Sequence, residues 1–131
     1  EKVKDLRNKM KEIEANDPDA TVENNRRLRR LQNKVRDTLY ENFKSRGLEQ
    51  DDIRSAIMGE SGEDIKLSPA ARREIPYSFE CKNQESINIW KSLEQAEENS
   101  NGYTPCLIFK RNRSKIYAVL ELEDFVNLIK K

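Results

Sequence analysis

The stretch Tyr77-Ser78-Phe79-Glu80-Cys81-Lys82 alternates apolar and polar side chains, which is the pattern of a β-strand. Successive side chains of a strand point to opposite faces, so one face carries apolar groups and the other carries polar groups. Glu80 and Lys82 lie two positions apart and share the polar face. The stretch therefore predicts a strand that sets a carboxylate beside an ammonium group.

A second strand is expected before it, over Asp64–Leu67, after a glycine-containing turn at Gly59–Gly62. Asp64 begins this strand, and the apolar side chains that follow point to the face opposite Asp64. Pairing with the strand that carries Glu80 can set the two carboxylates side by side. The sequence thus predicts two acids and a lysine converging where two strands meet.

The remaining apolar patterns extend this arrangement in both directions along the chain. Strands are expected over Ile53–Met58, Cys106–Lys110 and Lys115–Leu120, and helices over about Thr21 to Arg46, about Glu85 to Asn99 and Leu122 to Ile129. The first three strands in chain order, Ile53–Met58, Asp64–Leu67 and Tyr77–Lys82, are expected to form an antiparallel meander. The order of the elements predicts an α/β fold with a mixed sheet flanked by helices.

The N-terminal part is expected to form a helical extension over residues 1–20, followed by the main domain over residues 21–131. Its apolar positions alternate in steps of three and four, the spacing of a contact between two helices, and are Val3, Leu6, Met10 and Ile13. Asn16-Asp17-Pro18-Asp19 interrupts this pattern. The seam is a candidate surface for self-association.

Two of the predicted helices, and the segment after the second one, contain polar or aromatic residues that could contact a ligand. Gln32 lies within the apolar stripe of the Thr21–Arg46 helix, so its amide is expected to face the body of the protein. Trp90 lies on the stripe of the Glu85–Asn99 helix, which favours core packing over stacking on a nucleobase. Tyr103, beside a glycine, is the more exposed aromatic residue and a weaker candidate for DNA contact.

The composition excludes several classes of function. Histidine is absent, which removes Ser-His-Asp hydrolases, Cys-His proteases, zinc sites with histidine ligands and nucleases with a histidine base. Cys81 and Cys106 are the only cysteines, and both are expected to be buried thiols. No stretch approaches the roughly 20 apolar residues of a membrane span, and the N-terminus lacks the apolar centre of a signal peptide. An intracellular, cytoplasmic location is the expectation.

The acids and the lysine suit the hydrolysis of a phosphodiester bond. Hard oxygen ligands hold Mg²⁺ while leaving positions open for water and phosphate. A lysine ammonium can stabilise the negative charge that grows during the reaction. The Glu-x-Lys triplet alone is weak evidence, because an ion pair on one face of a strand also explains it, and Asp64-Ile65-Lys66 has the same form.

Several short motifs together resemble a known family. They are Arg54-Ser55 to Gly62, Glu63-Asp64-Ile65, Phe79-Glu80-Cys81-Lys82-Asn83 and Gln95-Ala96. In this combination the chain resembles the PD-(D/E)XK nucleases, and most of all the branch similar to the Holliday junction resolvases of phages and archaea. The resemblance covers roughly Arg26 to Leu120. It implies a restriction-endonuclease-like core with the element order αβββαβ, and a Mg²⁺- or Mn²⁺-dependent endodeoxyribonuclease without a small-molecule cofactor.

The resemblance also implies roles for individual residues. Asp64, Glu80 and the backbone carbonyl of Cys81 would bind the metal, and Lys82 would be the catalytic lysine. Many relatives carry a glutamate on the first core helix, and Gln32 occupies the equivalent position here. Glutamine can orient a metal-bound water but adds no charge, so metal binding would be weaker than with three carboxylates.

DNA contacts are expected at two places. By the resemblance, Ser55 would lie near the scissile phosphate, and Arg54 and Gln95 would contact DNA close to it. A predicted turn that is rich in cations would contact phosphates, through Lys110, Arg111, Arg113 and Lys115. The whole-chain net charge of +1 does not by itself indicate a nucleic-acid partner.

Three functions stay open at this stage. The first is a nuclease for branched or duplex DNA, either structure-selective or nicking, which acts inside a host cell if phage-encoded. Cutting a four-way junction symmetrically favours a homodimer, because a two-fold dimer supplies two sites. The second is a catalytically inactive DNA-binding or assembly module that keeps the nuclease fold, and the change at Gln32 favours it. The third, a helical adaptor, is disfavoured by the predicted strands.

Overall fold

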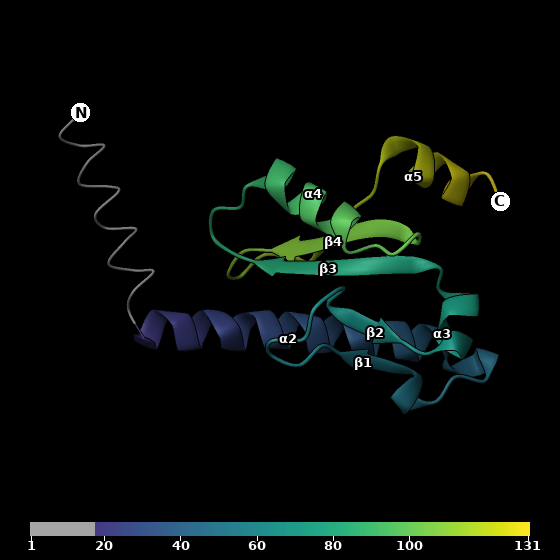
Figure 1. Ribbon diagram of the computed structural model, residues 1–131, viewed down its shortest axis with the longest axis horizontal. Coiled ribbons are helices and arrows are strands. Elements are labelled where there is room, and N and C mark those ends of the chain that lie inside the picture. The colour runs from purple at the N-terminus through teal and green to yellow at the C-terminus, as the bar shows by residue number, and fades with distance from the viewer. Residues whose placement is uncertain (1–17) are drawn as a thin grey trace.

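The computed structural model describes residues 18–131, with side chains from Thr21 onward, and its course is drawn in Figure 1. The apolar seam of Val3, Leu6, Met10 and Ile13 lies outside the described residues, so the division at residue 20 stays a prediction. No helix in the described part is long and apolar enough to cross a membrane. The described elements form an α/β fold with a mixed sheet, as predicted.

The long helix α2, Pro18–Phe43, is the spine of the molecule. It begins at a proline, which is well tolerated in the first turn of a helix. Its apolar stripe buries Leu31 and Val35 against the sheets. A short 3-10 segment, Lys44–Arg46, follows, and Gly47 ends it with a φ of 87°, a conformation that favours glycine. The prediction for this helix is confirmed.

Strands β1, Ile53–Ser55, and β2, Ile65–Leu67, form a two-stranded antiparallel sheet that packs against α2. Both strands are shorter than predicted. Beyond Ser55 the chain turns, and the Glu60 amide donates to the carbonyl oxygen of Ile57 over 3.0 Å. The apolar residues Ile57 and Met58 are exposed in this turn. The apolar run therefore ended in a loop and not in a longer strand.

The second sheet contains three strands in the order β3, β4, β5. Strand β3, Tyr77–Asn83, runs parallel to β4, Thr104–Lys110, and β4 runs antiparallel to β5, Tyr117–Val119. The sheet is therefore mixed. Helix α4, Ile89–Glu98, makes the crossover between the parallel strands and covers the face opposite α2 (Figure 1).

The predicted antiparallel meander is correct only for β1 and β2. Strand β3 instead pairs in parallel with β4 along its whole length. One backbone hydrogen bond joins the two sheets, from the Asp64 amide to the Phe79 carbonyl oxygen over 3.0 Å. Helix α3, Pro69–Glu74, connects β2 to β3 in the chain, in place of the tight turn of a hairpin. The alternation of apolar and polar residues predicted the strands. It did not predict which neighbouring strand would pair with β3 along its whole length.

The main core lies between α2 and the two sheets. Its buried members include Ile53 of β1, Ile65 of β2, and Phe79 and Cys81 of β3. Both cysteines are buried free thiols, as predicted, and burial raises the pKa of the Cys106 thiol to about 11. The apolar face of β3 thus points to α2, and its polar face, with Glu80, points toward α4.

The prediction that Trp90 packs in the core is wrong, because its side chain is 76% exposed. Helix α4 begins at Ile89, and the side chain of Asn88 caps it by accepting a hydrogen bond from the Lys91 amide over 3.1 Å. Ser92 and Ala96, four residues apart, are the buried positions of the helix. Their small side chains face the sheet, which leaves Trp90 on the outer side of the helix.

The last helix, α5, Leu122–Ile129, has the predicted bounds. No residue of α5 is buried, and its exposed apolar side chains are Leu122, Phe125, Val126, Leu128 and Ile129. Helix α5 lies at the end of the molecule, beyond α4 (Figure 1). Its amphipathic face is therefore without a partner within the described residues.

Candidate active site

Asp64 lies where the two sheets meet. It immediately precedes β2, and its backbone carbonyl oxygen accepts a hydrogen bond from the Ala56 amide over 2.8 Å. Its carboxylate Oδ2 accepts a hydrogen bond from the Cys81 amide of β3 over 2.7 Å. These contacts, with the bond from its own amide to Phe79, hold the carboxylate against the edge of β3 that β4 leaves free.

Glu80 and Lys82 project from the same face of β3. The Lys82 Nζ lies 3.9 Å from Glu80 Oε1, and the Asn99 side-chain amide donates to Glu80 Oε2 over 3.4 Å. The Glu80 side chain is 6% exposed, while Lys82 is 21% exposed. The structure therefore brings a buried acid and a more accessible ammonium together, next to Asp64.

The electrostatics of the two carboxylates are coupled. Burial raises the pKa of Glu80 to about 7, and the charge of Asp64 adds to this rise, while Asn99 and Lys82 oppose it. Burial also raises the pKa of Asp64, against the lowering by the Cys81 amide and by Lys82. Two carboxyl groups in one partly dry site repel each other when both are ionised. A cation between them would remove this cost.

The donor atoms fit a hard divalent cation. Asp64 and Glu80 supply carboxylate oxygens, the ligand type that Mg²⁺ and Mn²⁺ prefer. The N–H and C=O of one strand residue point to the same edge of the strand, so the Cys81 carbonyl is directed to the edge that faces Asp64. Among the described residues no group of three or more His, Cys, Asp or Glu side chains could hold a metal. A metal bound here would therefore depend on two carboxylates and on backbone oxygen.

Gln32 is the predicted partner from α2. It is buried, as expected, with 6% of its surface exposed. It lines a cavity of about 500 Å³ together with Asp64 and with the Ala56–Glu60 turn. The structure thus places the Gln32 amide and the Asp64 carboxylate on one cavity. Their roles in chemistry stay predictions.

The residues predicted to lie along the DNA near this site are arranged differently from one another. Ser55 is buried, and its hydroxyl donates to Asn33 Oδ1 on α2 over 2.9 Å. Arg54 is exposed and forms two hydrogen bonds with the Glu60 carboxylate, over 2.9 and 2.8 Å. Gln95 is exposed on α4. None of these three side chains forms a hydrogen bond or ion pair with Asp64, Glu80 or Lys82.

The predicted cationic turn follows β4. Ser114 closes it by accepting a hydrogen bond from the Arg111 amide over 3.0 Å. Lys110 and Arg113 face α2 across a cleft, whereas Arg111 and Lys115 are exposed and do not line it. The prediction that Tyr103 is the more exposed aromatic residue is wrong, because Tyr103 is 37% exposed and Trp90 is 76% exposed. The Arg72 guanidinium lies over the Tyr103 ring at 4.2 Å and covers part of it.

The sequence analysis missed two features of the site. Asn99 was assigned only to the end of α4, yet its amide binds Glu80. Glu63 was quoted only as part of the motif Glu63-Asp64-Ile65, without a role of its own. It is buried, accepts a hydrogen bond from the Ser78 hydroxyl over 3.0 Å, and forms an ion pair with Arg72. An acid next to an apolar strand start was the available clue to a buried partner.

Comparison with known protein families gives a match. The sequence model of a protein family described as "Phage putative PDDEXK endonuclease" matches residues 29–131. None of the curated proteins, and none of the solved structures, is similar enough to count as a match. The matched range includes Gln32, Asp64, Glu80 and Lys82 and covers most of the chain. The chain belongs to this family of phage PDDEXK endonucleases.

Proposed function

We propose that this chain is a divalent-metal-dependent endodeoxyribonuclease that hydrolyses phosphodiester bonds on an αβββαβ core. The observation that carries the proposal is the convergence of Asp64, Glu80 and Lys82 where β2 meets β3. The membership of the PDDEXK endonuclease family supports it independently, because nucleases of this kind act on DNA.

The roles follow from the positions of the groups. Asp64, Glu80 and the Cys81 carbonyl oxygen hold Mg²⁺ or Mn²⁺. A divalent metal held there would supply polarisation of a phosphoryl oxygen and a bound water of lowered pKa. Lys82 is more accessible than Glu80, and its ammonium stabilises the negative charge that grows on the phosphate. Asn99 fixes the orientation of Glu80, and Gln32 orients a water at the cavity wall.

Cleavage of synthetic DNA tests the proposal. The protein is incubated with a four-way junction, a flap, a nicked duplex and a plain duplex, each with Mg²⁺, Mn²⁺ or EDTA. We expect cutting with either metal and none with EDTA. Lys82→Ala should abolish cutting while DNA binding persists, and Lys91→Ala, at an exposed lysine on α4, should cut like the wild type. Absence of cutting on all four substrates with both metals would overturn the proposal.

We further propose a homodimer that cuts a branched DNA such as a four-way junction. The unpartnered apolar face of α5 supports self-association, because large exposed apolar patches mark interaction sites. Two antiparallel copies of α5 would set the acidic first turn, with Glu123 and Asp124, against Lys130 and Lys131 of the second copy. This pairing also opposes the two helix dipoles favourably.

The oligomeric state tests this second proposal. Light scattering of the wild type should give the mass of a dimer, and Phe125→Glu should give a monomer. Leu67→Ala, in β2 and away from α5, should remain a dimer. On a junction, the monomeric variant should nick one strand where the dimer makes paired cuts. A monomeric wild type would contradict the proposal.

The alternative function is an inactive DNA-binding or assembly module. The buried Gln32 on the cavity wall favours it, because the resemblance implies a glutamate there and glutamine adds no charge for metal binding. This alternative predicts tight binding of the same substrates and no metal-dependent cutting. The cleavage assay therefore separates the two functions directly.

A further inference from the structure

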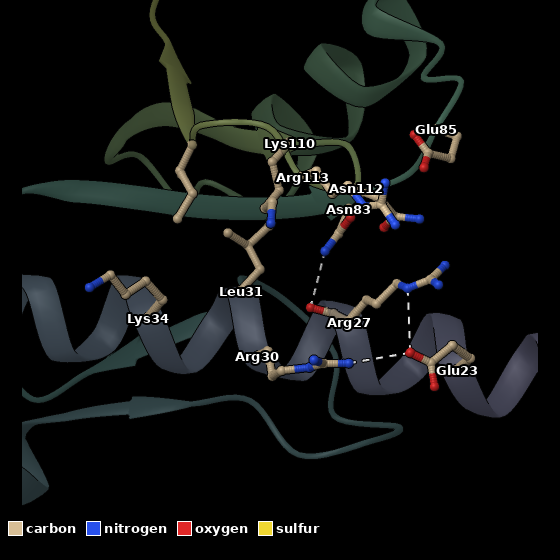
Figure 2. A pocket seen from close by; sticks show the side chains of 11 residues that line it. Glu23, Arg27, Arg30, Leu31, Lys34, Asn83, Glu85, Lys110, Asn112 and Arg113 are labelled. Atoms are coloured by element: carbon tan, nitrogen blue, oxygen red, sulfur yellow. Dashed lines mark hydrogen bonds and ion pairs between the residues drawn. The ribbon is translucent and has the colours of Figure 1, made fainter.

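A cleft of about 650 Å³ opens between α2 and the turn that follows β4, on the side of α2 away from the Gln32 cavity. Figure 2 shows Arg27, Arg30 and Lys34 on the helix wall, with Lys110 and Arg113 on the opposite wall. The sequence analysis singled out the turn as cationic. It did not predict that the helix would face the turn with three more cations.

The cleft has an excess of positive charge. Its five cations share it with only two carboxylates, those of Glu23 and Glu85. Glu23 lies 3.4 Å from Arg27 and 3.3 Å from Arg30, and it also contacts Arg26 outside the cleft. Lys34, Lys110 and Arg113 form no ion pair within the described residues. Because the chain is nearly neutral as a whole, this excess is local.

The two walls are held in place before any ligand arrives. The Asn83 side-chain amide at the end of β3 donates to the Arg27 carbonyl oxygen on α2 over 3.3 Å (Figure 2). The Gln84 amide donates to the Lys110 carbonyl oxygen over 3.2 Å. Arg113 adopts a φ of 63°, a left-handed conformation that favours glycine, and this turns the chain beside the cleft. Cations held apart in this way cost less to order when an anion binds.

The cleft adjoins the catalytic strand. Asn83 follows Lys82 directly and lies three residues beyond Glu80, which is about 10 Å along a β-strand. That length corresponds to about three nucleotides of one strand when it is measured along the axis of a DNA duplex. No aromatic side chain lines the cleft, so nothing in it stacks on bases. Its chemistry suits phosphates and is independent of base sequence.

We propose that this cleft binds the phosphate backbone of the DNA strand about three nucleotides from the bond that is cut. The position relative to the cut rests on the proposed function, whereas the binding itself does not. Arginine guanidinium groups suit this task because they bind phosphate oxygens with two parallel hydrogen bonds.

The first test measures DNA binding with EDTA by fluorescence anisotropy, between about 50 and 200 mM salt. The variant Arg30→Ala/Lys34→Ala/Arg113→Gly removes three cations, and glycine keeps the left-handed turn. Affinity should fall about 10- to 100-fold, and the slope of log affinity against log salt should fall by about two to three. Equal melting temperatures would show that the variant is folded. An unchanged slope in a folded variant would overturn the proposal.

A matched pair of single variants sharpens the test. Arg26 and Arg30 both contact Glu23, but only Arg30 lines the cleft. Arg30→Ala should weaken binding several-fold more than Arg26→Ala does. Equal losses would indicate a diffuse charge effect and would contradict a built cleft.

The second test locates the cleft along the DNA. Uncharged methylphosphonate linkages are placed one at a time on either side of the cut. The wild type should lose affinity for the linkage about three nucleotides away, and the triple variant should not lose more. If Lys82→Ala stops cutting but the cleft variants bind normally, the nuclease proposal stands and the cleft proposal is wrong. If no DNA is cut but the cleft variants lose affinity, the reverse holds.

Discussion

Glu63 and Asp64 are neighbours in the chain, yet the protein treats their charges in opposite ways. Glu63 is buried beside Ser78 and forms an ion pair with Arg72. Arg72 is held in turn by the Tyr77 carbonyl oxygen over 2.8 Å. Asp64 forms no ion pair among the described residues and instead lies next to Glu80, a second acid.

This difference is the one expected between a structural charge and a functional charge. The protein has the means to neutralise a buried carboxylate completely, since it does so at Glu63. Leaving Asp64 and Glu80 together, with the pKa of each raised, costs stability that an apolar pair would not cost. Such a conflict is typical of a site that is complete only with a ligand.

The largest expected effect is on the cleavage rate, when the charge of Asp64 is removed. Asp64→Asn keeps the shape of the side chain but removes its charge. The cleavage rate should fall by about 10³-fold or more, because the metal loses a ligand and the reaction loses its electrostatic support. Glu63→Gln, one residue earlier, should leave the cleavage rate of the folded protein unchanged. Equal losses of activity in the two variants, measured on folded protein, would contradict the division of roles.

The structural side should respond in stability. Glu63→Gln leaves the Arg72 guanidinium buried without its counter-charge, which should lower the free energy of unfolding by about 3 kcal/mol. Glu74→Gln breaks the exposed ion pair with Arg46 and should cost less than about 1 kcal/mol. Urea denaturation of both variants measures the difference. A small loss at Glu63 would show that its ion pair is not structural.

The same comparison explains what the sequence could predict about the site. Strand alternation sets the faces to which Asp64 and Glu80 point, and alternation is visible in the sequence. The backbone hydrogen bond from Asp64 to Phe79 then brings the two strands together. The ion pair of Glu63 leaves no such pattern, because its partner Arg72 lies in α3, after β2. Asn99 reaches Glu80 over a separation of 19 residues, which depends on the length of α4.

The fold shows the same limit. Helix α2 and strand β3 were predicted well because their periodic patterns are long. The burial of Trp90 was mispredicted because the small side chains Ser92 and Ala96 face the sheet. Pairing of β3 with β4 and the hydrogen bond of Ser55 to α2 are both long-range contacts. One-dimensional patterns give the faces of an element, but not its neighbours.

A smaller effect is expected from pH and metal on stability. Glu80 has a pKa of about 7 in the folded protein against an ordinary value of 4.5. The folded state therefore binds the proton more tightly than the unfolded state does. The free energy of unfolding of the metal-free protein should fall by about 2 kcal/mol as pH rises from about 4.5 to about 7.

Thermal melting with EDTA and with Mg²⁺ across this pH range measures the effect. Mg²⁺ binds the ionised carboxylates, so it should raise the melting temperature more above pH 7 than near pH 5. Glu80→Gln should flatten the pH dependence and remove most of the response to Mg²⁺. A metal-free wild type that becomes more stable between these pH values would contradict the raised pKa.

The smallest effect should come from restoring the missing charge. Gln32 lines the cavity that Asp64 also lines, and it is buried. Gln32→Glu adds a third carboxylate, so the metal concentration for half-maximal cutting should fall by about tenfold. Without metal, the added repulsion should lower the melting temperature. Gln95→Glu, at an exposed position of α4, is the matched control and should change neither quantity. If Gln32→Glu leaves the metal dependence unchanged, the amide does not act on the metal site, and two carboxylates with backbone oxygen suffice for it.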